Sequence, residues 1–449
     1  MRNDIPAPMK LDNWLAQRSQ SCPDRVALLA DGSEVTYAEL EAEATWVARR
    51  LAAYGVRRGT TVAMTMHARR EQVVLVHALM KLGAVLLPLG TRLSAEERAA
   101  IVAVEEPAVD LDDAGELTQT EADMPLLGEH DMDELACRVL TSGSTGAPDP
   151  VGLTYGNFLW SSVASAFNVG VEPDDRWLCC LPLSHISGLS VVMRSVIYGT
   201  AAVVHDGFNV DRVAAALEEE RITVVSLVAT MLTRLLEAGA DLSRPRTILV
   251  GGGPVPEDPL EEALGRGATV VQTYGLTEAC SQVTTLAPAD ARRKLGSAGR
   301  PLLTTHLRIQ EGEILVQGPT VAPGRTDADG WLHTGDLGHI DEEGFLYVDD
   351  RMDDMIVSGG ENVVPAEVEK VLLRHPEVAD AAVVGRDDPE WQQAVTAIVV
   401  LEDGSEATPE ELRRHCAESL TGFKVPKLVE LVAALPRTPS GKLMRRALR

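Results

Sequence analysis

The hydrophobic positions of the N-terminal part alternate between a helical and an extended spacing. Thr36 and Glu39 have the spacing of a helix-capping box, and apolar residues follow them on one helical face. Ser94 and Glu97 form a second capping box, and Thr154 is placed to cap another helix. Further apolar runs predict a helix at 71–82 and strands at 61–66, 84–87, 177–181, 201–204, 222–227, 247–250 and 269–273. Strands separated by helices predict an α/β fold of mixed or largely parallel sheets flanked by helices.

The pattern changes twice along the chain. Residues 108–134 are acidic and aperiodic, which predicts a surface loop. From about Gly312 short strands and turns rich in Gly and Asp predict a small β region, with strands at 313–317 and 345–348. Past Arg351 the pattern predicts a compact α+β unit with helices at 365–373 and 409–420 and strands at 378–384, 395–401 and 429–432. We therefore predict a large N-terminal domain, 1–352, and a small C-terminal domain, 353–449.

Composition limits the classes of function. The chain has 449 residues, which is too long for one ordinary core, and a formal net charge of −26. Such a charge disfavours nucleic acid and anionic membrane as partners, and a bound polyanion would need local cations or a metal. The six cysteines form no CxxC pair, and no signal peptide or membrane span is visible, so the cytoplasm is the expected compartment. The oligomeric state stays open, a homodimer included.

One stretch combines hydroxyls with glycines in a way that suits phosphate. Thr141–Val151 reads TSGSTGAPDPV and follows a short apolar segment. Glycines let backbone N–H groups turn toward one point, and hydroxyls add further donors. The spacing is not that of a P-loop, and the composition alone fits a flexible linker equally well. The rest of the chain has to decide between the two interpretations.

Five further loops carry chemically useful side chains, and most of them follow a predicted strand. They are LPLSHISGL (181–189) with His185, Gly251-Gly252-Gly253, QTYGLTEACSQ (272–282) with Tyr274, Thr277 and Glu278, WLHTGDLG (331–338) with Asp336, and LPRTPSGKLMRR (435–446) with Lys442. Each alone has a structural explanation. His185 could be a core or surface histidine, the glycines a turn, Glu278 a helix N-terminal charge, and Lys442 with Arg445 and Arg446 a solvated basic end.

Taken together and in order, these motifs resemble the acyl-adenylate-forming superfamily of acyl-CoA synthetases, adenylation domains and luciferases. The resemblance runs from about residue 10 to the C-terminus, through TSGSTG, HISGL, YGLTE, TGD, DRMDDMIVSGGENV and SGK. Within the superfamily LPLSHISGLSVVMRSVIYG, GGGPVP, QTYGLTEACSQVTTL and SGGENVVPAEVE look like the o-succinylbenzoate–CoA ligases of menaquinone biosynthesis. Related aryl-acid CoA ligases share part of this wording.

The resemblance implies an acid–thiol ligase that uses ATP, Mg²⁺ and coenzyme A. A carboxylate attacks the ATP α-phosphate and releases pyrophosphate, and the CoA thiol then displaces AMP. Lys442 would bridge the carboxylate and the α-phosphate, Thr277 would contact phosphate, and Glu278 would hold Mg²⁺. The residues implied to bind ATP or AMP are Thr141, Ser142, Gly143, Ser144, Thr145, Gly251, Gly252, Gly253, Thr273, Tyr274, Gly275, Asp336 and Arg351.

The resemblance also implies an acyl pocket and a moving C-terminal domain. His185 would stand near the carboxylate or the CoA tunnel, and Arg194 would pair with a second carboxylate, with Ser281 and Gln282 as polar helpers. A mobile C-terminal domain would turn about a hinge at Asp353 between the half-reactions. The loop that then moves to the CoA side contains Ser358, Gly359 and Gly360.

The chain departs from the family in the phosphate loop. The family pattern TSG[ST]TG-x-P-K-G-V has a lysine and a glycine where this chain has Asp149 and Pro150. Two unit charges about 4–6 Å apart interact by about 3–4 kcal/mol at an effective dielectric constant near 20, so exchanging a lysine for an aspartate beside a polyanion matters. Pro150 stiffens the loop and favours an extended Asp149 with its carboxylate turned outward. We expect weakened ATP affinity, and we expect the substitution Asp149→Lys to lower the KM for ATP.

Three alternatives remain. The chain could adenylate another aryl acid or small anion, or use another acceptor, in natural-product metabolism. It could be a degenerate nucleotide-binding protein without catalysis. A serine hydrolase is disfavoured because no G-x-S-x-G is present.

Overall fold

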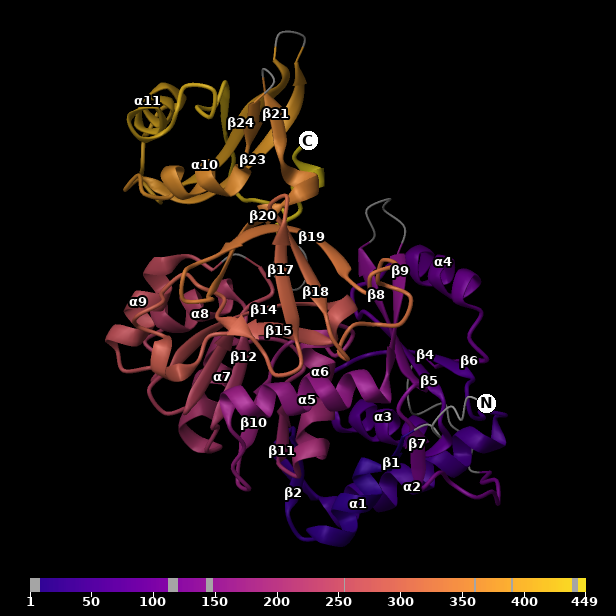
Figure 1. The fold of residues 1–449 in the computed structure, drawn as a ribbon. Helices are drawn as coiled ribbons and strands as arrows, with labels where there is room; N and C mark the ends of the chain where they lie inside the picture. The colour runs from indigo at the N-terminus through magenta and orange to yellow at the C-terminus, as the bar shows by residue number, and fades with distance from the viewer. Residues whose placement is uncertain are drawn as a thin grey trace. The chain divides into compact units, whose positions relative to one another are not determined.

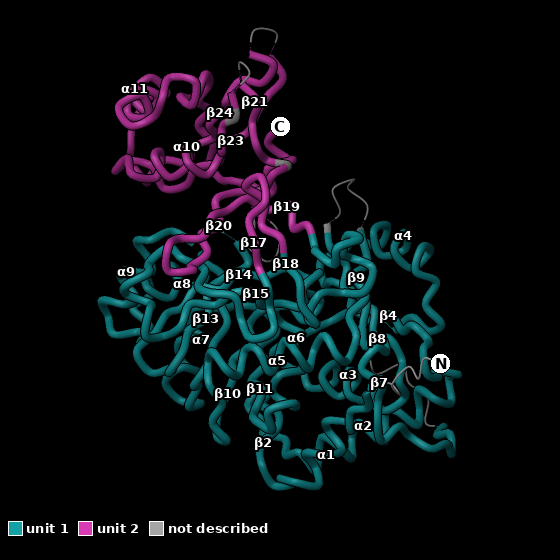
Figure 2. Tube along the Cα trace, viewed as in Figure 1, with its two compact units in different colours: residues 1–306, 316–332 teal, residues 307–315, 333–449 magenta. Residues whose placement is uncertain are grey.

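Helices and strands alternate through the computed structural model, as the hydrophobic pattern predicts (Figure 1). The structure describes residues 9–111, 120–142, 148–253, 255–358, 361–388, 391–437 and 443–449. These residues divide into two units, Met1–His306 with Val316–Leu332 and Leu307–Leu315 with His333–Arg449 (Figure 2). The small β region thus belongs mostly to the second unit. The functional boundary at Asp353 stays a prediction.

The first unit is built on a nine-stranded sheet with a parallel centre. Its strand order is β16 (Arg300–Pro301), β15 (Ser281–Thr285), β14 (Val270–Leu276), β13 (Thr247–Val250), β12 (Val224–Leu227), β10 (Arg176–Cys179), β11 (Ala201–Val204), β2 (Val26–Ala30) and β3 (Ser33–Thr36). The strands from β14 to β2 pair in parallel, and the outer ones are antiparallel. Strands buried on both faces read as continuous apolar runs, and this pattern located β10, β11, β12, β13 and β14. The outer strands β2, β3, β15 and β16 were not predicted.

A second, five-stranded sheet completes the first unit. Its order is β6 (Val109–Leu111), β4 (Thr61–Thr65), β5 (Val85–Leu89), β8 (Leu135–Ser142) and β9 (Pro148–Thr154), with β9 antiparallel at the edge. Helix α3 (Arg70–Leu82) packs on β5 and on β2, so it lies between the two sheets. Its side chains from Gln72 to Leu82 are all buried, as a helix enclosed by two sheets requires.

Several of the remaining helices of the first unit begin at local capping signals. The capping boxes predicted at Thr36 and Ser94 are present, and Thr154 caps α5. Helix α5 packs on α6, on β15 and on β9. The bounds of these helices are α1 (Trp14–Ser21), α2 (Tyr37–Ala53), α4 (Ala95–Glu105), α5 (Tyr155–Val169), α6 (Ile186–Tyr198), α7 (Val210–Glu219), α8 (Ala229–Glu237) and α9 (Glu257–Gly265).

The predicted surface loop at 108–134 is partly wrong. It contains β6, and also β7 (Glu129–Asp131), which pairs with β1 (Lys10–Asp12). His130 of β7 is 1% exposed and stacks on Tyr155, with ring centroids 4.0 Å apart. Burial lowers the pKa of His130 to about 4, so the ring is neutral. Contacts distant in sequence, which an acidic aperiodic stretch does not reveal, order this segment.

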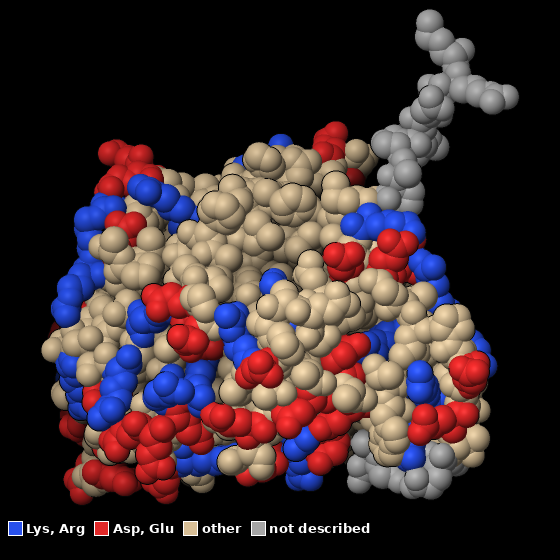
Figure 3. Space-filling model, turned by 90° about the horizontal axis from the view of Figure 1, so that it is seen from below, with Lys and Arg blue, Asp and Glu red and all other residues tan. Residues whose placement is uncertain are grey.

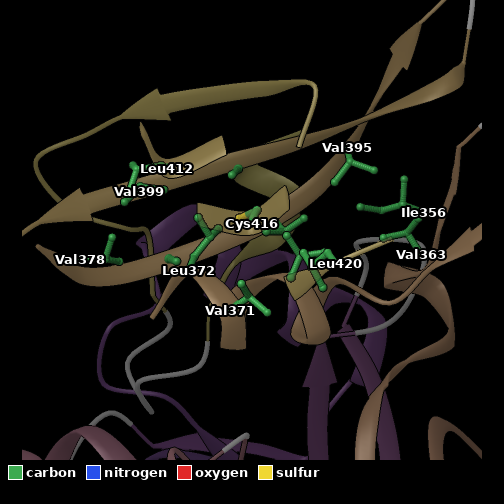
Figure 4. Packing of buried hydrophobic residues seen from close by; sticks show 14 of the residues in the cluster. Ile356, Val363, Val371, Leu372, Val378, Val395, Val399, Leu412, Cys416 and Leu420 are labelled. Atoms are coloured by element: carbon green, nitrogen blue, oxygen red, sulfur yellow. The ribbon is translucent and has the colours of Figure 1, made fainter. Parts of the chain in front are cut away.

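The second unit contains two sheets of its own. One has the order β17 (His306–Gln310), β18 (Glu313–Gln317), β19 (Leu332–Ile340) and β20 (Leu346–Arg351). The other has the order β22 (Glu361–Val363), β21 (Ile356–Ser358), β24 (Gln392–Leu401) and β23 (Val378–Asp388), with β25 (Leu428–Leu431) beside β24. The helices α10 (Pro365–Leu372) and α11 (Pro409–Ser419) contribute Leu372, Leu412 and Cys416 to one buried cluster with Val395 and Val399 of β24 (Figure 4).

Among the described residues, no helix has both the length and the apolar character needed to cross a membrane.

A close backbone approach joins β14 to β15 in the first unit. The register between the two strands shifts at Tyr274 and Gly275. A Cβ at Gly275 would lie 1.7 Å from the Ser281 carbonyl oxygen, so only glycine fits there. Gly253, which lies in the turn after β13, has open space on all sides at its Cβ position.

Gly275→Ala should therefore force β14 and β15 apart. Overpacking of this kind costs about 1–3 kcal/mol of the free energy of unfolding. Thermal unfolding followed by circular dichroism measures the change, with Gly253→Ala as the matched control. Equal melting temperatures for Gly275→Ala and the wild type would show that β14 and β15 accommodate a Cβ there without loss of stability, which would contradict this prediction.

Candidate nucleotide and acyl site

Several of the predicted loops lie at one edge of the large sheet. Strands β10, β12, β13 and β14 are neighbours and run in parallel. Their carboxyl ends therefore point the same way, and ligands of open α/β sheets bind beyond such ends. His185 follows β10, and Gly251–Gly253 follow β13. Tyr274 lies within β14, and Glu278 comes shortly after this strand ends.

The glycine turn lies directly against β14. A Cβ at Gly251 would lie 2.6 Å from the carbonyl oxygen of Thr273, and the Gly251 N–H donates to the Leu227 carbonyl at 3.2 Å. Gly252 has a φ of +83°, a left-handed conformation that favours glycine. The Thr273 hydroxyl donates to the Thr284 carbonyl at 2.9 Å. The residues predicted to line the adenine pocket are thus brought together by backbone contacts.

Thr277 and Glu278 lie in a tight turn between β14 and β15. The 3-10 turn Thr277–Ala279 is followed by Cys280 and Ser281, both with positive φ, which reverse the chain. Glu278 is half-buried, and its carbonyl oxygen accepts a hydrogen bond from Ala322 N–H at 2.8 Å. The described residues contain no cluster of three metal-ligating side chains. A single carboxylate suits Mg²⁺, which takes one or two protein carboxylates together with phosphate oxygens and water.

The predicted phosphate loop is the end of a β hairpin. Strands β8 and β9 pair Thr141 with Asp149, and the Thr141 hydroxyl donates to the Asp149 carbonyl at 3.1 Å. Pro150 fits because β9 is an edge strand. Ser142 ends β8. Gly143, Ser144 and Thr145 lie outside the described residues.

The carboxylate of Asp149 has a partner that the sequence did not indicate. Arg325 donates to both of its oxygens, from Nη1 to Oδ2 at 2.6 Å and from Nη2 to Oδ1 at 2.8 Å. Hydrogen bonding to Arg325 lowers the pKa of the Asp149 carboxyl, which therefore stays ionised. Nothing in the sequence indicated that an arginine 176 residues later offsets this charge. The outward direction of the carboxylate stays a prediction.

One of the predicted acyl-side residues is a buried cation. Arg194 of α6 is 3% exposed, and its Nη2 donates to the Ser161 hydroxyl at 3.0 Å. Its Nε has no hydrogen-bond partner, and no carboxylate of the described residues pairs with the guanidinium. Burial lowers the pKa of Arg194, yet a guanidinium stays charged in proteins. A buried charge without a counter-ion is costly, so this position suits an anionic ligand.

The other predicted acyl-side residues lie on the same elements. His185 is the residue before α6 and is half-buried, and burial lowers its pKa. Ser281 contacts α6 through a hydrogen bond of 3.4 Å from the Ser190 hydroxyl. Gln282 is 5% exposed, and its Oε1 has no partner in the described structure. Helix α6 and the start of β15 thus present buried polar groups with unused hydrogen-bonding capacity.

The second unit, considered by itself, holds the predicted ribose pair. Asp336 of β19 lies opposite Arg351 of β20, and Arg351 Nε lies 3.0 Å from Asp336 Oδ1. Asp353 belongs to the 3-10 turn Met352–Asp354, and Ser358 ends β21. Gly359, Gly360 and Lys442 lie outside the described residues.

Arg445 is not part of a solvated basic end. Its side chain is 12% exposed, and Nη2 lies 2.7 Å from an oxygen of Glu369. Nη1 lies 3.4 Å from Asp354 and 3.9 Å from Asp350. The chain just after Lys442 is therefore attached to the segment that contains the predicted hinge. The two adjacent arginines of LMRR, Arg445 and Arg446, carry no sequence signal that would tell a buried arginine from an exposed one.

Charged side chains of both signs lie on the surface. On the face shown in Figure 3, the described acidic and basic side chains are interspersed. A bound polyanion would need local cations or a metal, together with backbone donors, against a net charge of −26.

Comparisons with known proteins agree with this geometry. The sequence matches the family described as AMP-binding enzyme over residues 15–128 and 108–324, and the AMP-binding enzyme C-terminal domain over 367–442. A 2-succinylbenzoate–CoA ligase of Bacillus licheniformis is 41% identical, covering 97% of this chain and 99% of that protein. A similarly named ligase of Bacillus cereus is also 41% identical, over 98% of each chain.

Solved structures give the same result in three dimensions. An o-succinylbenzoate CoA synthetase from Bacillus subtilis, in complex with the acyl-adenylate intermediate OSB-AMP, matches with a TM-score of 0.92. It is 40% identical, and the match covers 98% of each chain. The structure of that synthetase with ATP and magnesium ion matches with a TM-score of 0.90, over 98% of this chain and 100% of that one. Family matches over most of the sequence and likeness along nearly its whole length lead to one conclusion: the chain belongs to the AMP-binding enzyme family.

Proposed function

We propose that this protein is an ATP-dependent acid–CoA ligase that acts on 2-succinylbenzoate. In the first half-reaction a substrate carboxylate oxygen bonds to the ATP α-phosphorus, and pyrophosphate leaves. In the second the CoA sulfur bonds to the acyl carbon, its proton is lost to solvent, and AMP leaves. The names of full-length relatives and the ligands of the Bacillus subtilis synthetase support both half-reactions.

The observation that carries the choice of acid is the buried guanidinium of Arg194, which has no carboxylate partner among the described residues. The proposed substrate has two carboxylates, and only one of them is activated. The second must be neutralised wherever it is buried, because an unpaired buried carboxylate is costly. Arg194 is buried, charged and without a carboxylate partner among the described residues, and Gln282 of β15 adds an unused amide oxygen. A pocket for an uncharged ring would leave this buried cation without a counter-ion, which is costly.

The remaining residues would serve the nucleotide. Gly251–Gly253 and Thr273–Gly275 would enclose the adenine, and Asp336 with Arg351 would bind the ribose. Thr277 and the hydroxyls of the hairpin would donate to phosphate oxygens, with Glu278 as the magnesium ligand. Magnesium, when bound, offsets phosphate charge. Lys442 would bridge the two reacting anions, as a compact cation that offsets charge growing on phosphorus. A homodimer and a cytoplasmic location stay predictions.

ATP–pyrophosphate exchange across a panel of acids tests the proposal. We expect exchange with 2-succinylbenzoate in the absence of CoA, and AMP release with thioester formation once CoA is added. Preference for another aryl acid would move the protein to a different branch of adenylating enzymes. An absence of exchange with every acid would contradict the proposal and favour a nucleotide-binding protein without catalysis.

Arg194→Met should raise the KM for 2-succinylbenzoate strongly and leave the KM for ATP unchanged. Removing one partner of a buried charge pair costs about 2–5 kcal/mol, which corresponds to a factor of roughly 30 or more. Steady-state kinetics should be compared with a monocarboxylate analogue that lacks the non-reacting carboxylate. The variant and the wild type should use this analogue equally well. An equal rise in KM for both acids would show that Arg194 does not recognise the second carboxylate.

Lys442→Ala should lose adenylate formation and still convert supplied acyl-adenylate with CoA. The physical reason is that the lysine offsets charge only when the carboxylate and the α-phosphate meet. Pyrophosphate exchange measures the first step, and thioester formation from synthetic acyl-adenylate measures the second. Similar losses in the two assays would sink this role.

Asp353→Pro should spare pyrophosphate release and block thioester formation. Proline fixes φ, so the backbone at 353 could no longer turn between the half-reactions. A burst of pyrophosphate without thioester is the expected result in a rapid-quench experiment. Unchanged overall turnover would show that the hinge lies elsewhere.

A further inference from the structure

Arg325 makes a three-point contact with the start of strand β9. Besides its two hydrogen bonds to the Asp149 carboxylate, at 2.6 and 2.8 Å, Nη2 donates to the Pro150 carbonyl at 2.8 Å. The side chains are only 28% and 43% exposed. A bidentate arginine–carboxylate pair has a defined geometry and is stronger than a single-point surface pair, which contributes little.

The chain segment that carries Arg325 is itself tied to the candidate site. Ala322 N–H donates to the Glu278 carbonyl at 2.8 Å, and Arg325 N–H donates to the Ala322 carbonyl at 3.2 Å. Asn157 at the start of α5 donates to the Val321 carbonyl at 3.1 Å. Arg325 therefore links two parts of the candidate site. One is the hairpin arm, by which we mean β9 with Asp149, and the other is the turn Thr277–Ala279 with Glu278.

Electrostatics agree with this geometry. Hydrogen bonding to Asp149 raises the pKa of Arg325, and the Glu278 carboxylate adds a smaller effect of the same sign. Arg325 thus lies within the electrostatic range of both carboxylates. The family pattern has a lysine where this chain has Asp149, so this chain carries an anion there and has its cation on a different segment.

We propose that Asp149 and Arg325 are positioning residues for ATP, whose ion pair fixes the hairpin arm to the Glu278 turn and replaces the lysine of the family pattern. The proposal deepens the proposed function and rests on it, because it assigns the hairpin to the nucleotide. It also reverses the expected effect of the substitution Asp149→Lys. With Arg325 in place, the introduced ammonium group would face a second cation and push the arm away from the turn.

Equilibrium binding of Mg·ATP, measured by calorimetry without acid or CoA, tests the pair independently of which acid is used. Asp149→Lys should weaken binding about tenfold through repulsion, and Arg325→Gln should do so about equally by leaving Asp149 uncompensated. The double variant that combines Asp149→Lys with Arg325→Gln has neither the repulsion between two cations nor an uncompensated Asp149. It should bind Mg·ATP with an affinity within about threefold of the wild type. Glu261→Lys on the exposed face of α9 controls for the change in net charge.

Kinetics separate positioning from a merely structural role. The single variants should raise the KM for ATP more than they lower kcat, with the KM for the acid unchanged. All variants should be compared below the onset of thermal unfolding. Additive effects of the two substitutions, tighter ATP binding by Asp149→Lys alone, or unchanged binding in both single variants would each overturn the proposal. ATP binding with the expected pattern but no turnover on 2-succinylbenzoate would instead contradict only the proposed acid.

Discussion

An acid–CoA ligase has to bring anionic substrates together, and this protein is itself strongly acidic. The candidate site therefore depends on how the negative charge of the substrates is offset. The formal net charge is −26, so the general field of the protein repels ATP and a dicarboxylate. The described structure meets this with individual cations in fixed positions. Arg194 is buried without a carboxylate partner, whereas Arg325 is held by Asp149 in a bidentate pair. The first is available to a ligand, and the second orders the polypeptide around one.

The fold places these groups through parallel strands. Because β10, β12, β13 and β14 run the same way, the turns that follow them meet at one edge of the sheet. The close approaches at Gly251 and Gly275 then bring the backbone of these turns into contact, and Cβ atoms there would collide with Thr273 and Ser281. The site is therefore built first from the backbone. The second unit, taken by itself, holds the Asp336–Arg351 pair on adjacent antiparallel strands.

Local signals predicted much of this and distant ones did not. Capping boxes such as those at Thr36 and Ser94 act within four residues and were predicted correctly. The buried parallel strands from β10 to β14 read as apolar runs and were also predicted, whereas the buried parallel strand β2 was missed. Buried His130 was missed because its order comes from stacking on Tyr155, not from its acidic neighbours. Arg325 was missed because the only sign of it was an anomaly at Asp149, and no local spacing reveals which arginine compensates. The roles of the site residues came from motif order; the structure adds where the described ones lie.

The stoichiometry of the complete reaction tests the proposed ligase activity most directly. Purified protein should be incubated with 2-succinylbenzoate, ATP, magnesium and CoA, and the products separated and identified by mass spectrometry. We predict AMP, pyrophosphate and the CoA thioester in equal amounts, with no thioester when ATP or CoA is omitted. Formation of ADP and phosphate, or of AMP without any thioester, would contradict an acid–CoA ligase that works through an acyl-adenylate.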